Sequence, residues 1–399
     1  MTPPARPRLE TRTAPHATTP VRAPWERLVR ALTEPAAMAG FDLADWDALV
    51  PQAYAAGLLG RLAALARRAG IEAAIPLPVQ RHLNAAYTVA AQQERAVHWE
   101  LTQLSAALAE TGGPVVLLKG AAYAAAGLAP GPGRLFSDID LLVPREQLAA
   151  TEAALMLGGW NSSSHDPYEQ RYYRQWMHEL PPMTHIKRQT VLDLHHNILP
   201  ETARIQTRPD LILAGARPLP GYPRFSIPAP VDLVLHSATH LFHEGEWEHG
   251  LRDLVDLDAL LREHGREPVF WDRLFERAAQ LNLGRPLFYA LRCAERILHT
   301  PCPSDMTRRC PQVPGKAHRA LMDALFVAAF ATAHHSFRTR LSGVAEFALY
   351  VRSHWLRMPL PLLLPHLVRK SWQKRVLPWF EPPAEPATPA GPGGADPLR

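Results

Sequence analysis

The sequence predicts a mixed α+β (α/β) fold, with a small sheet between an N-terminal helical cap and a mainly helical C-terminal half. Three observations support it. Stretches rich in Ala and Leu with helical character occupy residues 25–112. Short apolar runs bounded by Gly and Pro follow in residues 113–225, as in buried strands. Helical patterns return over residues 226–380. Strands that alternate with helices are typical of an α/β core.

The two ends of the chain are predicted to be disordered tails. Of the 40 prolines, six lie in residues 1–24 and six in residues 381–399. These segments have almost no large apolar side chains, so they bury too little surface to offset the entropy lost on ordering. The folded body is therefore predicted to span residues 25–380.

The overall composition excludes several classes of protein. With 47% hydrophobic and 20% charged residues, the chain is neither collagen-like nor wholly disordered. No run reaches the roughly 18 apolar residues of a membrane-spanning helix, and residues 1–24 lack the apolar stretch of a secretory signal. The three cysteines cannot all pair with one another, which fits a reducing compartment. The predicted location is the cytoplasm.

The elements can be predicted in chain order. Ala55–Ala69 and Val79–Glu110 are expected to be helical, the second ending at Gly112-Gly113. The core should then contain strands over 115–118, 139–143, 184–188 and 191–198, with helices over 121–128 and from Pro144 to Gly158. Later helices are expected over 231–243, 251–264, 271–281, 285–298, 316–337 and 344–355. Prolines 359, 361 and 365 should break any helix that follows.

Two carboxylates on one predicted strand indicate a metal site. Alternate residues of a strand share a face, so Asp138 and Asp140 point together while Ile139 and Leu141 point into the core. Two such acids repel each other, and a divalent cation relieves that repulsion. Mg²⁺ is typically held by one or two carboxylates together with phosphate oxygens and water. The alternative is a pair of acids at a solvated sheet edge.

A third acid has a similar setting. In the later strand, Asp193 and His195 share the face opposite Leu192 and Leu194. If this strand lies beside the Asp138/Asp140 strand, three carboxylates converge, as in sites where metal ions activate a hydroxyl and stabilise a leaving phosphate. Asp193 is also the candidate general base.

The residues before the first acid fit a phosphate. Lys119 and Gly120 close the first predicted strand before a helix, where a glycine lets the backbone approach a phosphate and a helix N-terminus favours an anion. Lys119 and Arg134 add positive charge for a triphosphate. With Ser137, which directly precedes Asp138, these are the candidate nucleotide-binding residues.

Taken together, these motifs resemble the uncharacterised bacterial nucleotidyltransferase family of the DNA polymerase beta-like superfamily. The resemblance is carried by Leu118-Lys119-Gly120, Arg134, the strands 137–143 and 191–195, the His-containing stretch 235–241 and the stretch 251–254. It implies a nucleotidyltransferase-type mixed-sheet core and Mg²⁺ bound by Asp138 and Asp140, with Asp193 as the third carboxylate and Gly120 under the phosphates. The implied reaction moves a nucleoside monophosphate from an NTP, such as ATP, to a hydroxyl with release of pyrophosphate.

Several alternatives stay open at this point. The acceptor is a small molecule, a sugar, a peptide or protein, or RNA. Ala121 stands where superfamily members commonly have Ser or Gly, and 17 residues separate Gly120 from Asp138, more than in the compact motif. These departures leave open a weakly active or inactive nucleotide-binding or interaction protein on the same fold.

Three further features have weaker signals. His236, His240 and His243 recur on one predicted helix, where packed histidines are favoured over a zinc site. Asp253 and Asp256 either face the cleft or are solvated helix acids. Residues 347–380 contain six Lys or Arg and no acid, which accounts for the net charge of +5. We expect that segment to form a basic face packed on its own domain. The alternatives are that it contacts an anionic membrane surface or a nucleic acid, or that it binds RNA as part of a toxin-like transferase.

Overall fold

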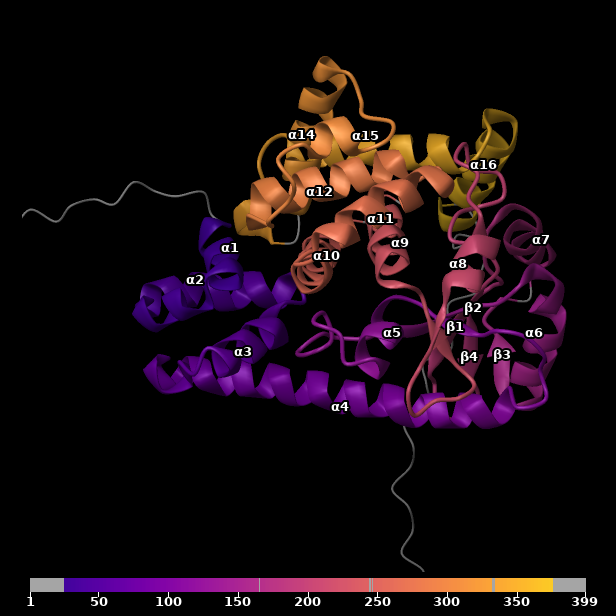
Figure 1. The fold of residues 1–399 in the computed structure, drawn as a ribbon, viewed down its shortest axis with the longest axis horizontal. Helices are drawn as coiled ribbons and strands as arrows, with labels where there is room; N and C mark the ends of the chain where they lie inside the picture. The colour runs from indigo at the N-terminus through magenta and orange to yellow at the C-terminus, as the bar shows by residue number, and fades with distance from the viewer. Residues whose placement is uncertain (1–24, 165, 244, 246, 332–333, 376–399) are drawn as a thin grey trace, which may run out of the picture.

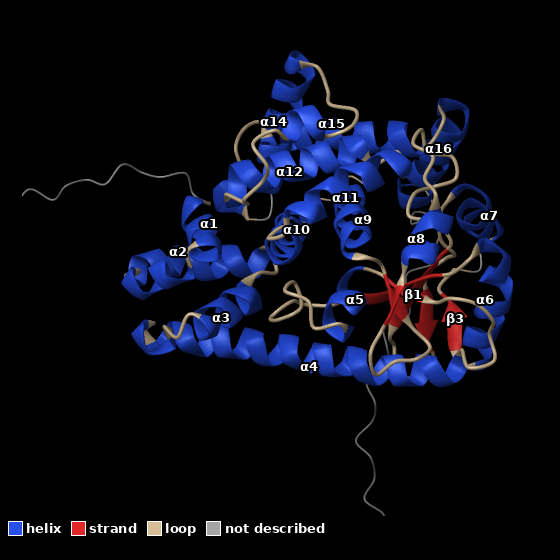
Figure 2. Ribbon diagram, viewed as in Figure 1, coloured by secondary structure: helices blue, strands red, loops and turns tan. Residues whose placement is uncertain are grey.

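The computed structural model describes residues 25–164, 166–243, 245, 247–331 and 334–375. The predicted tails 1–24 and 381–399 lie outside these residues. The described chain places a seven-stranded mixed sheet between helical regions from the two halves of the chain (Figures 1 and 2). The prediction of a mixed α+β fold is confirmed.

The N-terminal region contains four α-helices that lie along one side of the molecule (Figure 1). They are α1 (Glu26–Thr33), α2 (Leu43–Ala55), α3 (Leu59–Arg68) and α4 (Leu77–Ala107), with 3₁₀ turns at Pro35–Gly40 and Glu72–Ala74. In Figure 1, α1–α3 lie at the left and α4 runs along the bottom as far as the sheet. The expected helix over 55–69 is interrupted at residues 56–58, where Gly57 has a φ of +67°. The 31-residue α4 packs against α3, α5 and α6, so it links this region to the sheet.

The sheet has the strand order β3-β4-β5-β2-β1-β7-β6. Its strands are β1 (Val116–Leu117), β2 (Asp138–Leu142), β3 (Trp160–Ser162), β4 (Met183–His185), β5 (Val191–His195), β6 (Arg217–Pro218) and β7 (Ser226–Ile227). The pairs β2–β5 and β1–β7 are parallel, and the other neighbours are antiparallel. All four predicted strands are present: β1, β4 and β5 are shorter than predicted, and β2 is shifted by one residue. Strands β3, β6 and β7 were not predicted.

Alternation along β2 and β5 separates the core from the polar face. Ile139, Leu141, Leu192 and Leu194 are at most 2% exposed, and complete burial of each such side chain contributes about 1.5–3 kcal/mol. Two short helices follow the strands of the core, α5 (Lys119–Ala125) and α6 (Leu148–Leu157). Helix α5 packs against β2, α4 and α9, so it lies between the sheet and the C-terminal helices (Figure 2).

The remaining helices cover the sheet and form the C-terminal half. They are α7 (Pro167–Trp176), α8 (Pro209–Gly215), α9 (Pro230–His243), α10 (Gly250–His264), α11 (Pro268–Gln280), α12 (Gly284–Leu298), α13 (Met306–Arg309), α14 (Lys316–Phe330), α15 (Ser342–Arg357) and α16 (Leu360–Arg375). The six helices predicted after Pro230 are all present, although α14 ends at Phe330 instead of continuing to Phe337.

The predicted break after residue 358 is wrong, because α16 is a helix with Pro365 inside it. Pro361 lies in the first turn, where the missing N–H has no intrahelical partner in any sequence. Pro365 removes one further bond, which would have reached the carbonyl of residue 361. Among the described residues, no single helix has the length and apolar character to cross a membrane; α2 and α3 meet that criterion only as a pair bent by 120°.

Candidate active site

Pairing of β2 with β5 brings the predicted carboxylates together. The two strands are parallel, and their register places Asp140 directly opposite Asp193. Asp138 lies two residues before Asp140 on the same face of β2. Because β2 lies inside the sheet and Asp140 is 1% exposed, the alternative of two acids at a solvated sheet edge is wrong.

Asp140 is held by the side chains of a lysine and a histidine. Lys119 Nζ lies 3.1 Å and His195 Nε2 lies 3.0 Å from the same oxygen, Asp140 Oδ1. Although burial opposes ionisation, Lys119 and His195 hold the pKa of Asp140 well below its usual range. The other ring nitrogen of His195 lies 3.3 Å from Glu179 Oε2. Against the effect of burial, Asp140 and Glu179 raise the pKa of His195.

Asp193 has the opposite environment. Its Oδ1 is buried and has no hydrogen-bond partner among the described residues. Burial, followed by the charge of Asp140, raises the pKa of Asp193 to about 7. Atoms of Asp140, Asp193 and His195 that can each bind a metal lie within 4.8 Å of one another. The three side chains thus form a candidate metal-binding group.

The backbone at Lys119 and Gly120 adopts a strained turn beside Arg134. Lys119 has a φ of +44°, a left-handed conformation that is uncommon for a residue with a side chain and that clusters at functional sites. A Cβ atom at Gly120 would lie 2.5 Å from a guanidinium nitrogen of Arg134, so a larger residue there would displace that group from its present position. Ser137 Oγ donates a 2.8 Å hydrogen bond to Asp138 Oδ1.

A cavity of about 480 Å³ opens between this turn and helices α9 and α10. Of the seven residues that the sequence predicted for the site, six line it: Lys119, Gly120, Arg134, Ser137, Asp138 and Asp140. The seventh, Asp193, lies beside Asp140 but is not part of the lining. The opposite wall includes Ser237, His240, Arg252, Asp253 and Asp256.

The structure decides between the alternatives for the two helix acids. Asp253 and Asp256 both line the cavity, so the alternative of solvated helix acids is wrong. Asp256 is 3% exposed and is paired with Arg134 and Arg61. No sequence pattern indicated the role of Arg61, which lies in the N-terminal region far from every motif.

The helix histidines do not form a metal site within the described residues. His236 and His243 are buried in α9, and His240 lines the cavity. Burial, together with the nearby charge of Lys119, lowers the pKa of His236 to about 3. In the described part of the chain, none of the three belongs to a group of three ligand-bearing side chains. Packed histidines, the favoured prediction, describe His236 and His243 correctly.

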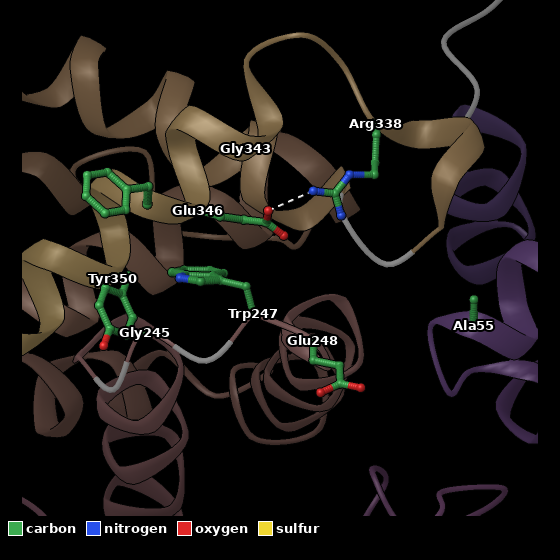
Figure 3. Close-up of a pocket in the computed structure, with 9 residues that line it drawn as sticks. Ala55, Gly245, Trp247, Glu248, Arg338, Gly343, Glu346 and Tyr350 are labelled. Carbon is green, nitrogen blue, oxygen red and sulfur yellow. Dashed lines mark hydrogen bonds and ion pairs between the residues drawn. The ribbon is translucent and has the colours of Figure 1, made fainter. Parts of the chain in front are cut away.

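A second hollow, of about 650 Å³, shares two lining residues with the cavity; Figure 3 shows this second hollow. Trp247 and Glu248 line both hollows. The wall on the α15 side carries Phe347 and Tyr350, together with Glu346, which accepts a 2.8 Å hydrogen bond from Arg338 (Figure 3). The two hollows therefore share part of their walls at Trp247 and Glu248.

Two arginines of the basic segment 347–380 contact other parts of the same chain. Arg352 donates a 2.8 Å hydrogen bond to the carbonyl of Phe242, and Arg369 pairs with Asp166 at 3.0 Å. Both contacts agree with a basic face packed on its own domain. Residues 376–380 lie outside the described residues, and contact of the segment with a membrane surface or nucleic acid stays a prediction.

Comparison with known proteins agrees with this geometry. The sequence model of one protein family, described as uncharacterised nucleotidyltransferase, matches residues 42–299. The match spans α2 to α12 and includes every residue of the candidate site. No curated protein matches the chain. Because the match covers more than half of the sequence, the protein is a transferase that belongs to the uncharacterised nucleotidyltransferase family.

Proposed function

We propose that this nucleotidyltransferase uses Mg²⁺ to move a nucleoside monophosphate from an NTP to a hydroxyl of an acceptor, with release of pyrophosphate. The observation that carries the proposal is the pairing of β2 with β5, which places Asp140 opposite Asp193, with Asp138 two residues earlier on the same face of β2. Three acids beside a cavity lined with Lys and Arg suit a metal-bound triphosphate.

The residues present fit a divalent cation. Asp193 carries a buried oxygen that finds no partner in the described part of the chain, and its neighbour Asp140 raises the cost of its negative charge. Both contacts of Asp140 with Lys119 and His195 use Oδ1, which leaves Oδ2 for a metal. Asp138, Asp140 and Asp193 would hold the ion, which supplies charge stabilisation to the reacting phosphate when bound.

The proposed reaction is a single displacement at the α-phosphorus. The acceptor oxygen forms a bond to that phosphorus, and the bond from the phosphorus to the oxygen bridging the α- and β-phosphates breaks. Pyrophosphate leaves with that bonding electron pair. Asp193 takes the proton of the acceptor hydroxyl, for which its raised pKa is suited.

The cavity also suggests where each substrate lies. Lys119 and Arg134 supply positive charge for the phosphates, and Gly120 and Ser137 lie beside them in the lining. The acceptor then approaches from the α9–α10 wall, and a large acceptor extends past Trp247 and Glu248 into the second hollow (Figure 3).

The test is transfer of label from each of the four α-³²P-labelled NTPs, with Mg²⁺ and a cell extract as the source of acceptor. Wild-type protein is expected to label an acceptor, and Asp138→Asn/Asp140→Asn is expected to label none. Label transfer that survives in the double variant would contradict the mechanism. Binding of Mg·NTP without transfer to any acceptor would instead favour the nucleotide-binding alternative.

A further inference from the structure

We propose that Asp256 and Arg61 are positioning residues, which fix Arg134 in the cavity wall so that its guanidinium binds the triphosphate. The inference rests on the proposed function, because it assigns a task within the same nucleotide site. It makes helix α3 of the N-terminal region and helix α10 of the C-terminal half parts of the triphosphate-binding apparatus.

Arg134 is tightly confined within the cavity wall. Its Nε donates a 2.7 Å hydrogen bond to Asp256 Oδ2, and another of its nitrogens donates a 3.1 Å bond to the carbonyl of Leu135. The guanidinium carbon lies 5.4 Å from the centre of the Phe136 ring, and the side chain is only 10% exposed. With five N–H donors, a guanidinium held by these two bonds keeps donors for a ligand.

The second oxygen of Asp256 is occupied by another arginine. Arg61 lies 3.3 Å from Asp256 Oδ1, and both side chains are less than 10% exposed. Two arginines share this one carboxylate, because the other acids whose charges reach them, Asp253 and Asp258, are themselves paired with Arg252 and Arg262. The cluster therefore carries an excess positive charge in a buried place. Burial of such a charge is unfavourable unless an anion offsets it. Because Arg134 faces the cavity, a phosphate group in the cavity is the anion that this cluster fits.

Arg61 also holds the loop that carries Arg134. It donates a 2.8 Å hydrogen bond to the carbonyl of Ala129 and a second bond to the carbonyl of Pro130. One residue earlier, a Cβ atom at Gly60 would lie 2.6 Å from the carbonyl oxygen of Gly133, so the backbones of α3 and the loop touch directly. The loop between α5 and β2, residues 126–137, therefore forms an arm that reaches α3 and returns to the cavity.

Equilibrium binding separates this role from a merely structural one. Wild-type protein is titrated with the Mg²⁺ complexes of α,β-methylene ATP, GTP, CTP and UTP, and with Mn²⁺ alone as a probe of the carboxylates. The analogue that binds best is then titrated against Asp256→Asn. Loss of a charge-assisted contact in this variant is expected to weaken analogue binding about 10- to 100-fold, with Mn²⁺ affinity unchanged within about twofold.

A matched control comes from the C-terminal half. Asp323 also holds two arginines, Arg292 at 2.6 Å and Arg296 at 2.7 Å, and it does not line the cavity. Asp323→Asn removes the same charge from a cluster of the same composition that is more exposed, and it is expected to leave analogue binding unchanged. If both Asp→Asn variants weaken analogue binding equally, the effect is structural and the inference is overturned.

A double variant tests whether Asp256 acts through Arg134. Arg134→Gln/Asp256→Asn is expected to bind the analogue no more weakly than Arg134→Gln alone, whereas additive losses would overturn the inference. If Asp256→Asn does not fold, Arg61→Lys replaces it, because lysine keeps the charge but cannot bind the carboxylate and two carbonyls together. A wild-type protein that binds no analogue contradicts the proposed function itself; analogue binding that is unchanged in the variants contradicts only the positioning role.

Discussion

Asp193 is the residue whose surroundings most clearly favour a bound cation. It lies opposite Asp140, and its buried Oδ1 has no hydrogen-bond partner in the described ranges. Without a metal ion, such a carboxylate opposes folding, because a buried polar atom is left unsatisfied beside a like charge. The residue proposed to act in the reaction therefore lowers the stability of the folded protein.

We therefore expect Asp193→Asn to stabilise the protein in the presence of EDTA. The amide removes the buried charge, and in a folded body of this size relief of about 1 kcal/mol corresponds to a rise of about 1–2 °C in the unfolding midpoint. Addition of Mg²⁺ should remove this advantage, because only the wild-type carboxylate gains a ligand. Thermal unfolding with EDTA and with Mg²⁺ measures both effects. An asparagine variant that is less stable than wild type in EDTA would contradict the account of this residue.

Lys119 lies close both to the proposed metal ligand Asp140 and to the cavity proposed for the nucleotide. Its ammonium group pairs with Asp140 at 3.1 Å, yet its side chain also lines the cavity proposed for the triphosphate. A divalent cation and Lys119 therefore compete for the negative charge of Asp140. When the nucleotide is bound, the phosphates offer the ammonium group another partner.

The variant Lys119→Met separates these tasks. Removal of the competing charge should strengthen binding of Mn²⁺ alone about 3- to 10-fold, while loss of a phosphate ligand should weaken Mg·NTP analogue binding by a similar or larger factor. Calorimetric titrations with the metal and with the analogue provide the two numbers. Weaker binding of Mn²⁺ in this variant would show that Lys119 supports the metal site.

At the scale of single residues, the sequence predicted the acids well and their partners poorly. Strand alternation alone places Asp138 with Asp140 and Asp193 with His195. The bond from His195 to Asp140 depends on the register between two strands that are about 50 residues apart in the chain. No local sequence pattern determines that register. Glu179 approaches His195 through an isolated bridge between their backbones, for which no local pattern exists.

Among the elements, the arm over residues 126–137 explains a departure from the compact motif. Its backbone contacts α3 at Gly60 and Gly133, and Gln93 of α4 accepts a 2.9 Å hydrogen bond from the N–H of Phe136. Gly133 has a φ of +74°, so its conformation also favours glycine. The extra length of the loop is therefore used to contact the N-terminal helices.

This contact predicts an effect at a distance from the cavity. In Gly60→Ala, the new Cβ meets a backbone carbonyl that cannot turn away, so the arm must shift. We expect a lower unfolding temperature and analogue binding that is about tenfold weaker. Gly343→Ala is the matched control, since Gly343 also lies in a helix and its Cβ would meet nothing within 4 Å. Equal behaviour of the two variants would contradict the role given to the arm.

The elements missed from the sequence were missed for two different physical reasons. Strands β6 and β7 have two residues each and β3 has three, which is too short for alternation to be recognised. Helix α16 was missed because its prolines were read as breaks, although Pro361 occupies the first turn, where proline is tolerated. The long periodic helices were predicted closely, because tertiary packing adds little to a pattern that is already clear.

For the whole molecule, the cavity lies between two halves of the chain. One wall comes from the sheet and α5, and the other comes from α9 and α10. A ligand that binds both walls favours the folded state, and its stabilisation grows with its concentration relative to its dissociation constant. The family match over residues 42–299 includes both walls, so nucleotide binding and folding of this region are expected to be coupled.

We expect Mg·NTP to stabilise wild-type protein by about 2.7 kcal/mol at a hundredfold excess over its dissociation constant. Asp138→Asn/Asp140→Asn should lose most of this gain, because the metal that links nucleotide to protein is no longer held. Thermal unfolding with the nucleotide alone, Mg²⁺ alone and both together measures the effect. Equal stabilisation of wild type and double variant would show that nucleotide binds elsewhere.

Mass spectrometry of cells tests the central claim, nucleotidyl transfer at Asp138, Asp140 and Asp193, most directly. Small molecules, RNA and proteins are compared after expression of wild-type protein and of Asp138→Asn/Asp140→Asn. The account predicts a species heavier by one nucleoside monophosphate residue with wild type, and its absence with the double variant. The same increment in both samples, or an increment of a single phosphate group with wild type, would contradict the claim.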